Sequence, residues 1–198
     1  MPVQLTVFNL STTLANGPGV IHPTLLHDET HAMLIDAGMP EGVPMMLTEM
    51  QAAGVPPERL THIVITHADL DHVSGLKTLL SACPNARVYC HEKEKPYVQG
   101  DVPPLRLAAM EAGLQNLTGE TLAQMTALAQ RLRANYKNLS VPVAGTLKEG
   151  EALPCDARVI ETPGHTPGHI CLYEPQSRTL IAGDLFNVED GKLALPPE

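Results

Sequence analysis

Residues 61–75, THIVITHADLDHVSG, decide the fold class of this chain. They open with a β-branched apolar run that predicts a buried strand, and from Val73 onward the pattern becomes helical. Between these parts, two histidines and two aspartates stand in the six positions from His67 to His72. Because α/β sheets bind ligands at the carboxyl ends of their strands, the stretch predicts a strand, a ligand-binding loop and a helix.

Strand and helix signals alternate on both sides of this stretch. The patterns predict strands at residues 3–10, 20–27, 32–35, 61–65, 87–90, 140–143, 157–161, 169–173 and 179–182, and helices at 42–53 and 73–82. From Pro103 to about Asn138, leucines and methionines recur at helical spacing and interrupt the strand rhythm. We therefore expect one α/β domain over residues 1–198, with a helical insert at about 103–138.

The charge and the cysteine content argue against several classes of function. Thirteen basic and twenty-two acidic residues give a net charge of -9, which repels nucleic acid and anionic lipid. The four cysteines are scattered without CxxC spacing, which indicates buried thiols in a reducing compartment rather than a zinc ribbon or a redox pair. With no leader-like start and no long apolar run, we expect a cytoplasmic protein with a small-molecule substrate, and neither nucleic acid nor membrane as a partner.

Two further strand ends carry candidate metal ligands. The segment ETPGHTPGH, residues 161–169, presents His165 in a loop fixed by proline and glycine, and in LIAGDLF a glycine precedes Asp184. Each feature has an ordinary alternative, since Asp69 or Asp71 could cap the following helix and Asp184 could stand in a turn. Three strand ends with nitrogen and oxygen donors in one chain favour a shared metal site.

These motifs together resemble those of the metallo-beta-lactamase superfamily, from MLIDAG through HADLDH to TPGHTPGH and AGD. The resemblance implies a four-layer αββα sandwich with metals at the edge between the sheets. It also implies six ligands: His67, Asp69 and His165 for a first metal, Asp71 and His72 for a second, and Asp184 as the bridge between them.

Position 69 departs from the family pattern HxHxDH, because this chain reads HxDxDH. Asp69 adds a negative charge and a hard oxygen donor, so we expect two divalent ions, zinc first, with iron or manganese as alternatives. A carboxylate at this position also resembles the flavodiiron branch of the superfamily. The alternative of an oxygen or nitric oxide reductase that uses a separate flavoprotein therefore stays open.

The end of the chain is the second departure. Family members usually continue past the AGD strand to another strand, a helix and a last histidine, whereas this sequence ends in NVEDGKLALPPE and has no histidine after His169. We expect the usual C-terminal strand and helix to be lacking, which leaves the second metal to water or another residue. His169 itself is expected to pack beside the site rather than to bind metal.

The reaction that the resemblance implies is hydrolysis of a small-molecule ester, lactone, thioester or amide by a metal-bound hydroxide, with lactonase activity as the first expectation. Asp71 is the expected catalytic residue: one oxygen would bind metal, and the other would orient the nucleophile and carry a proton to the leaving group. A binding protein whose metal site has decayed is a further alternative. The helical insert should shape the pocket, or pair two subunits as a homodimer.

Overall fold

The computed structural model describes residues 2–14, 17–189 and 192–194, and its larger sheet has six strands in the order β1-β4-β5-β6-β7-β8. These strands are β1 (Gln4–Val7), β4 (Thr24–His27), β5 (Ala32–Ile35), β6 (His62–Ile65), β7 (Arg87–His91) and β8 (Gly145–Leu147). The pairs β1/β4 and β4/β5 are antiparallel, and β5 to β8 run parallel. The parallel strands therefore direct their carboxyl ends to one edge of the sheet.

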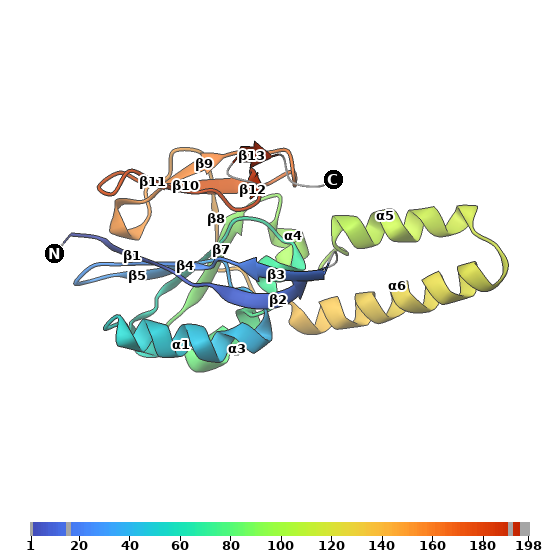
Figure 1. Cartoon of the computed structure of the whole chain (residues 1–198), viewed down its shortest axis with the longest axis horizontal. Coiled ribbons are helices and arrows are strands. Elements are labelled where there is room, and N and C mark those ends of the chain that lie inside the picture. The colour runs from blue at the N-terminus through green and yellow to red at the C-terminus, as the bar shows by residue number, and fades with distance from the viewer. Residues whose placement is uncertain (1, 15–16, 190–191, 195–198) are drawn as a thin grey trace.

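A smaller sheet has the order β11-β10-β9, and two ribbons complete the strands. The smaller sheet contains β9 (Arg158–Glu161), β10 (Ile170–Glu174) and β11 (Thr179–Ile181), and the ribbons pair β2 (Leu10–Leu14) with β3 (Gly17–Ile21) and β12 (Asn187–Glu189) with β13 (Lys192–Ala194). All pairings in these sheets are antiparallel. Figure 1 shows the smaller sheet lying over one face of the larger one.

Helices cover the other face of the larger sheet, where α1 and α3 lie side by side (Figure 1). The helices are α1 (Val43–Ala52), α2 (Leu70–Val73), α3 (Leu76–Ala82), α4 (Lys95–Val98), α5 (Leu105–Gly113) and α6 (Gly119–Leu139), with 3-10 turns η1 (Pro40–Gly42), η2 (Pro57–Arg59), η3 (Leu114–Asn116) and η4 (Pro154–Asp156). The described residues thus form three of the four sandwich layers that the sequence predicts, and within them no helix covers the outer face of the smaller sheet.

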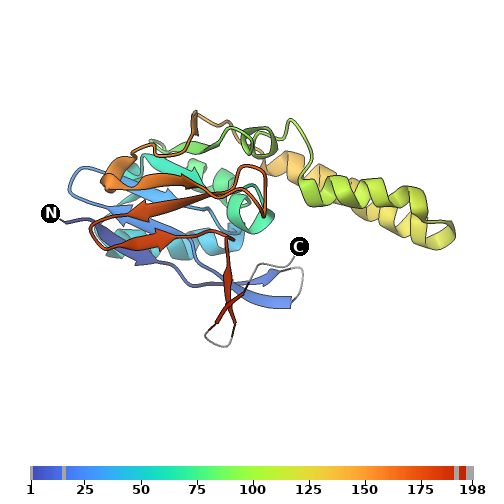
Figure 2. The same cartoon turned by 90° about the horizontal axis from the view of Figure 1, so that it is seen from above.

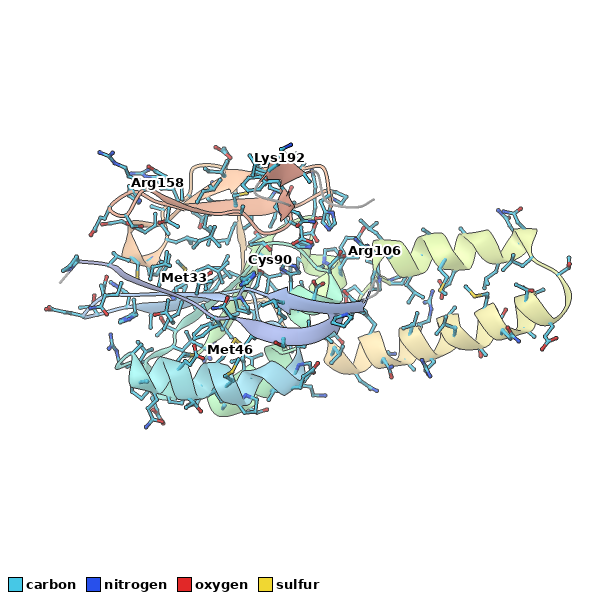
Figure 3. The ribbon with its side chains drawn as sticks, viewed as in Figure 1. Met33, Met46, Cys90, Arg106, Arg158 and Lys192 are labelled. Atoms are coloured by element: carbon cyan, nitrogen blue, oxygen red, sulfur yellow. The ribbon has the colours of Figure 1, made fainter. Side chains whose placement is uncertain are left out.

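Strands β5 and β6 send successive side chains into two different cores. Leu34 and Ile63 pack with Met46 of α1 beneath the helices. Met33 and Val64, one on each strand, lie in the second core, between the two sheets. The labelled Met46 and Met33 mark these two cores in Figure 3. Because both faces of these strands are buried, their sequences read as unbroken apolar runs rather than alternating ones.

Residues 140–143 form no strand, so that prediction is wrong, and the last strand of the large sheet is β8 instead. Pro142 lacks a backbone N–H and cannot pair in the middle of a sheet. Val141 and Val143 are nevertheless buried in the core beneath the helices. Their apolar character therefore reflects a packed connection and not a strand.

The region from α5 to α6 is a helical hairpin that projects from the sandwich (Figures 1 and 2). It occupies the segment that the sequence analysis assigns to a helical insert. Within its two helices, the buried side chains are Leu107, Ala129 and Tyr136. An exposed ion pair between Arg133 and Glu111 joins the helices. In the described part of the chain, no helix combines the length and apolar character needed to cross a membrane.

Candidate metal centre

Three loops, each of which follows a strand, bring the predicted ligands together. Those ligands are His67, Asp69, Asp71 and His72 after β6, His165 between β9 and β10, and Asp184 after β11. The first loop belongs to the larger sheet and the other two belong to the smaller one. The centre therefore exists only where the two sheets meet, as the sequence analysis expects.

His67, Asp69 and His165 form one group whose ligand atoms all lie within 4.8 Å of one another. Asp69 Oδ2 lies 3.2 Å from His165 Nε2 and 3.8 Å from His67 Nε2. Tetrahedral ligands about 2.1 Å from a zinc ion stand about 3.4 Å apart, so these spacings fit one ion. This group has the same membership as the predicted first metal site.

His67, His72 and Asp184 form a second group with the same spacing limit. Asp184 Oδ1 lies 3.2 Å from His72 Nε2, while its Oδ2 lies 3.9 Å from His67 Nε2 and 3.6 Å from His165 Nε2. The two oxygens of one carboxylate thus face different histidines. Such a carboxylate can place one oxygen on each of two neighbouring ions.

His67 belongs to both groups, and its ring is prepared to bind metal through Nε2. The Thr66 hydroxyl donates to Asp36, so it can only accept from His67 Nδ1, 3.1 Å away. Nε2 then carries the lone pair, and this buried atom has no hydrogen-bond partner among the described residues. Burial, reinforced by the nearby histidines, holds the pKa of His67 well below its usual value, which favours the neutral ligand form. A neutral nitrogen that has no hydrogen-bond partner and lies between two carboxylates is suited to bind a cation.

Asp36 orients both histidines of the HADLDH loop. Its Oδ2 accepts from His72 Nδ1 at 2.8 Å, which leaves His72 Nε2 directed at Asp184. Its Oδ1 accepts from the Thr66 backbone N–H at 2.8 Å. Although burial opposes the charged ring, the carboxylates of Asp36 and Asp184 raise the pKa of His72 well above its usual value. Asp36 belongs to the MLIDAG motif, but its orienting role, typical of carboxylates behind metal-binding histidines, was not predicted from the sequence.

Asp71 lies beside the centre but outside both groups. Its Oδ2 is 3.7 Å from His72 Nε2. Burial raises its pKa, and the charges of Asp184 and Asp69 act in the same direction against the lowering effect of His72. Asp71 is therefore a neighbour of the ligand groups, and its predicted place on the second metal stays a prediction.

Asp69 stands at the N-cap position of the four-residue helix α2, but its side chain makes no capping hydrogen bond. The carboxylate faces His165 and His67 instead. The alternative that Asp69 serves as a helix cap is therefore wrong. Its Oδ2 lies inside the first group.

Glu94 connects the two loops that supply the first group, and the sequence analysis missed it. Its side chain is buried, and its oxygens accept from the backbone N–H of Ala68 at 2.9 Å and of Gly168 at 2.8 Å. A Cβ at position 168 would lie 2.7 Å from His91 Nδ1 and 2.9 Å from Glu94, so glycine is required for this approach. A glutamate among the charged residues 92–95 gives no sequence signal for such a role.

His169 holds the third loop in place. Its Nε2 accepts from the Asp184 backbone N–H at 3.0 Å, and its Nδ1 contacts the Thr162 hydroxyl at 2.8 Å. Burial lowers its pKa to about 4, so the ring stays neutral at pH 7. A Cβ on Gly183, which has φ of +51°, would lie 2.8 Å from His169 Nε2. With both nitrogens engaged, His169 supports Asp184 and is not a ligand in this structure.

The helical hairpin reaches the centre at two points. Arg106 Nη2 on α5 lies 3.4 Å from Asp69 Oδ2. The Tyr136 hydroxyl on α6 donates to the carbonyl oxygen of Ala68, and burial raises its pKa. Neither contact was predicted from the sequence, because both residues stand within a long amphipathic helical pattern.

The family model for the metallo-beta-lactamase superfamily matches residues 16–197. The chain belongs to the metallo-beta-lactamase superfamily. The probable metallo-hydrolase YflN of Bacillus subtilis is 31% identical over 200 residues, which cover 95% of this chain and 67% of that protein. A hydroxyacylglutathione hydrolase of Synechococcus is 31% identical over 85% of this chain and 50% of its own, and one of Francisella tularensis subsp. novicida is 26% identical over 96% and 55%. The chain spans about half to two thirds of these relatives.

Solved structures of the superfamily share the fold. A metallo-beta-lactamase family protein of Thermus thermophilus superposes with a TM-score of 0.67 at 21% identity, covering 92% of this chain and 60% of that one. A Cronobacter sakazakii metallo-beta-lactamase superposes with a TM-score of 0.58 at 22% identity, over 86% and 57%. That enzyme is described by a HARLDQ motif, and residues 67–72 here read HADLDH. The predicted family and fold class are confirmed.

Proposed function

We propose that this protein is a metal-dependent hydrolase that cleaves an ester, lactone, thioester or amide bond in a small molecule. The observation that carries the proposal is the buried Nε2 of His67, which has no partner among the described residues and lies between Asp69 and Asp184. Leaving such a nitrogen unpaired costs free energy unless a cation occupies the space. The family and the named metallo-hydrolase relatives support the same conclusion.

The two groups would hold two divalent ions, and zinc is the metal that we expect. His67, Asp69 and His165 would hold one ion, and His72 with Asp184 would hold the other, with Asp184 shared through its second oxygen. Iron and manganese are the alternatives because Asp69 contributes a hard oxygen. When bound, such ions lower the pKa of a water molecule and polarise a substrate carbonyl.

The side chains around the centre have distinct tasks in hydrolysis. Asp36 and Thr66 fix the rings of His72 and His67 so that Nε2 of each faces the centre. Asp71, which lies outside both groups, keeps an oxygen that can orient the attacking water and pass its proton to the leaving group. Water or another residue would supply the remaining ligand atoms.

A thioester or a lactone is the substrate that we place first. Several relatives are named hydroxyacylglutathione hydrolases, which supports an acyl thioester, and lactonase activity is the expectation from the family resemblance. Attack on the carbonyl carbon expels a thiolate from a thioester, or opens a lactone to an alkoxide that remains attached and must take up a proton. The free, buried cysteines support the proposal of a reducing, cytoplasmic setting.

The test is metal analysis of protein purified without added metal, followed by assays on lactone, thioester and beta-lactam substrates. We expect stoichiometric metal, hydrolysis by the wild type, and a large loss of turnover in Asp71→Asn. Asp101→Asn, at an exposed position, is the matched control and should behave as the wild type. If the protein holds no metal and shows no turnover after loading with zinc, iron and manganese, the proposed hydrolase function is wrong.

The same measurements decide between the alternatives. A flavodiiron-like reductase would hold iron and would consume oxygen or nitric oxide when given a reduced flavoprotein. A binding protein with a decayed site would hold little metal, and Asp71→Asn would change nothing.

A further inference from the structure

We propose that Arg106 binds an anionic group on the substrate, so that the enzyme selects esters, lactones or thioesters that carry a carboxylate. This inference rests on the proposed hydrolase function, and it assigns the selection of charge to the helical hairpin rather than to the sandwich. Figure 3 labels Arg106 at the end of α5 that adjoins the sandwich.

The position of Arg106 fits substrate contact better than a structural role. It stands in the first turn of α5, and its side chain is 60% exposed while its guanidinium reaches Asp69. An exposed ion pair of this kind contributes little to stability, because water screens it and the side chain loses freedom. A guanidinium at the mouth of a metal centre is, however, well placed to meet an incoming ligand.

The contact of Arg106 with Asp69 uses the oxygen that a metal would take. Asp69 Oδ2 lies 3.4 Å from Arg106 Nη2 and 3.2 Å from His165 Nε2, so the same atom faces both the hairpin and the first group. When this oxygen coordinates a cation, less of its charge remains for the guanidinium. Arginine offers several donors in a fixed planar fork, which a carboxylate can satisfy with two hydrogen bonds.

The charge of the rest of the chain makes this cation important for an anionic substrate. The chain carries a net charge of -9, and Asp69, Asp71 and Asp184 surround the centre. Among the described residues, Arg106 is the arginine or lysine that forms an ion pair with a candidate ligand. Bound metal ions would also attract an anion, and Arg106 adds a second cation, set apart from the metals, that would fix where the carboxylate lies.

A recess with room for about one water molecule adjoins Leu105, the residue before Arg106. It is lined by Asp69, Tyr97, Pro104, Leu105 and Thr166, among others. The Thr166 hydroxyl is buried and has no partner in the part of the chain that the structure describes. Arg106 does not line this recess, so a substrate carboxylate would meet its exposed guanidinium outside it, beside Asp69.

The experiment compares two thioesters that differ only in charge. Lactoyl thioesters of mercaptopropionate and of mercaptopropionamide present a carboxylate and an isosteric neutral amide at the same position. With zinc-loaded enzyme, we expect the wild type to prefer the carboxylate in kcat/KM. Arg106→Ala should lose about 10- to 100-fold more on the carboxylate than on the amide, the range for a hydrogen bond to a charged group. Arg106→Lys should recover part of the loss.

A binding measurement separates this proposal from the proposed hydrolysis. Thioether analogues of both compounds, which cannot be hydrolysed, are titrated calorimetrically into the metal-loaded wild type, Arg106→Ala and Arg131→Ala. Arg131 is an exposed arginine on α6 and serves as the control. Tighter binding of the carboxylate by the wild type and Arg131→Ala, lost in Arg106→Ala, supports the proposal even where neither thioester is cleaved. An unchanged preference in Arg106→Ala, or no preference in the wild type, overturns it.

Discussion

In the sandwich, β5 and β6 are buried on both faces, whereas the hairpin buries Leu107, Ala129 and Tyr136 within its two helices. The sandwich supplies all the candidate metal ligands from three loops and the short helix α2. The hairpin contacts the ligand Asp69 through Arg106 and the neighbouring Ala68 through Tyr136. The two regions therefore differ in what their sequences must preserve. The sandwich must keep the candidate ligands in their relative positions, while the hairpin surface can vary without displacing them.

The largest expected effect comes from replacing His67, the residue that both ligand groups share. His67→Ala should lower metal affinity by more than about 100-fold, because it deletes a direct ligand where loss of an outer hydrogen bond alone costs 10- to 100-fold. Zinc content after dialysis against a chelator measures the effect. His22→Ala, at an exposed histidine of the sandwich, is the control and should retain metal. Equal metal content in both variants would contradict the proposed centre.

The second prediction compares packing in the two regions. Leu34→Ala should lower the free energy of unfolding by about 2–5 kcal/mol, because it leaves a cavity beneath the helices. Leu132→Ala in α6, where the side chain is half-buried, should cost about 1 kcal/mol. Urea unfolding curves measure both values. Similar losses would mean that the hairpin is packed as tightly as the sandwich.

The third prediction concerns Asp36, which belongs to the sandwich and contacts no metal itself. Asp36→Asn removes the charge that accepts from His72 Nδ1 and should weaken metal binding by about 10- to 100-fold. Calorimetric titration with zinc gives the affinity, and Asp101→Asn again serves as the control. Full affinity in the Asp36 variant would show that His72 is oriented by other groups.

The smallest predicted effect tests the point where hairpin and sandwich join. Tyr136→Phe removes the hydrogen bond to the Ala68 carbonyl and should destabilise the protein by about 1 kcal/mol. Metal content should stay unchanged, because Ala68 is not a ligand. Thermal unfolding and metal analysis of the same sample check both statements. Loss of metal here would show that the hairpin also shapes the ligand cage.

The strand-end ligands could be predicted from the sequence because their chemistry is local. His67 follows a parallel strand of the larger sheet, and His165 and Asp184 follow β9 and β11, which both run antiparallel to β10 and so end on the same side of the smaller sheet. The buried strands β5 and β6 could be read from their continuous apolar runs for the same reason.

The supporting contacts could not be predicted, because they depend on distant parts of the chain. Glu94 and Arg106 meet the metal loops only after folding, and no spacing in the sequence relates them to His165. The relation of Asp71 to the ligand groups likewise depends on the side-chain direction set by α2. Residues 140–143 were wrongly predicted as a strand because a packed loop can be as apolar as a strand.

The buried carboxylate of Glu94 couples the motions of two loops. Since it accepts from both Ala68 and Gly168, neither loop can swing away while the other stays in place. The two backbone amides should therefore exchange their hydrogens with solvent at one common rate, set by the opening of this single clamp. A label on either loop would then report the opening of both loops at once.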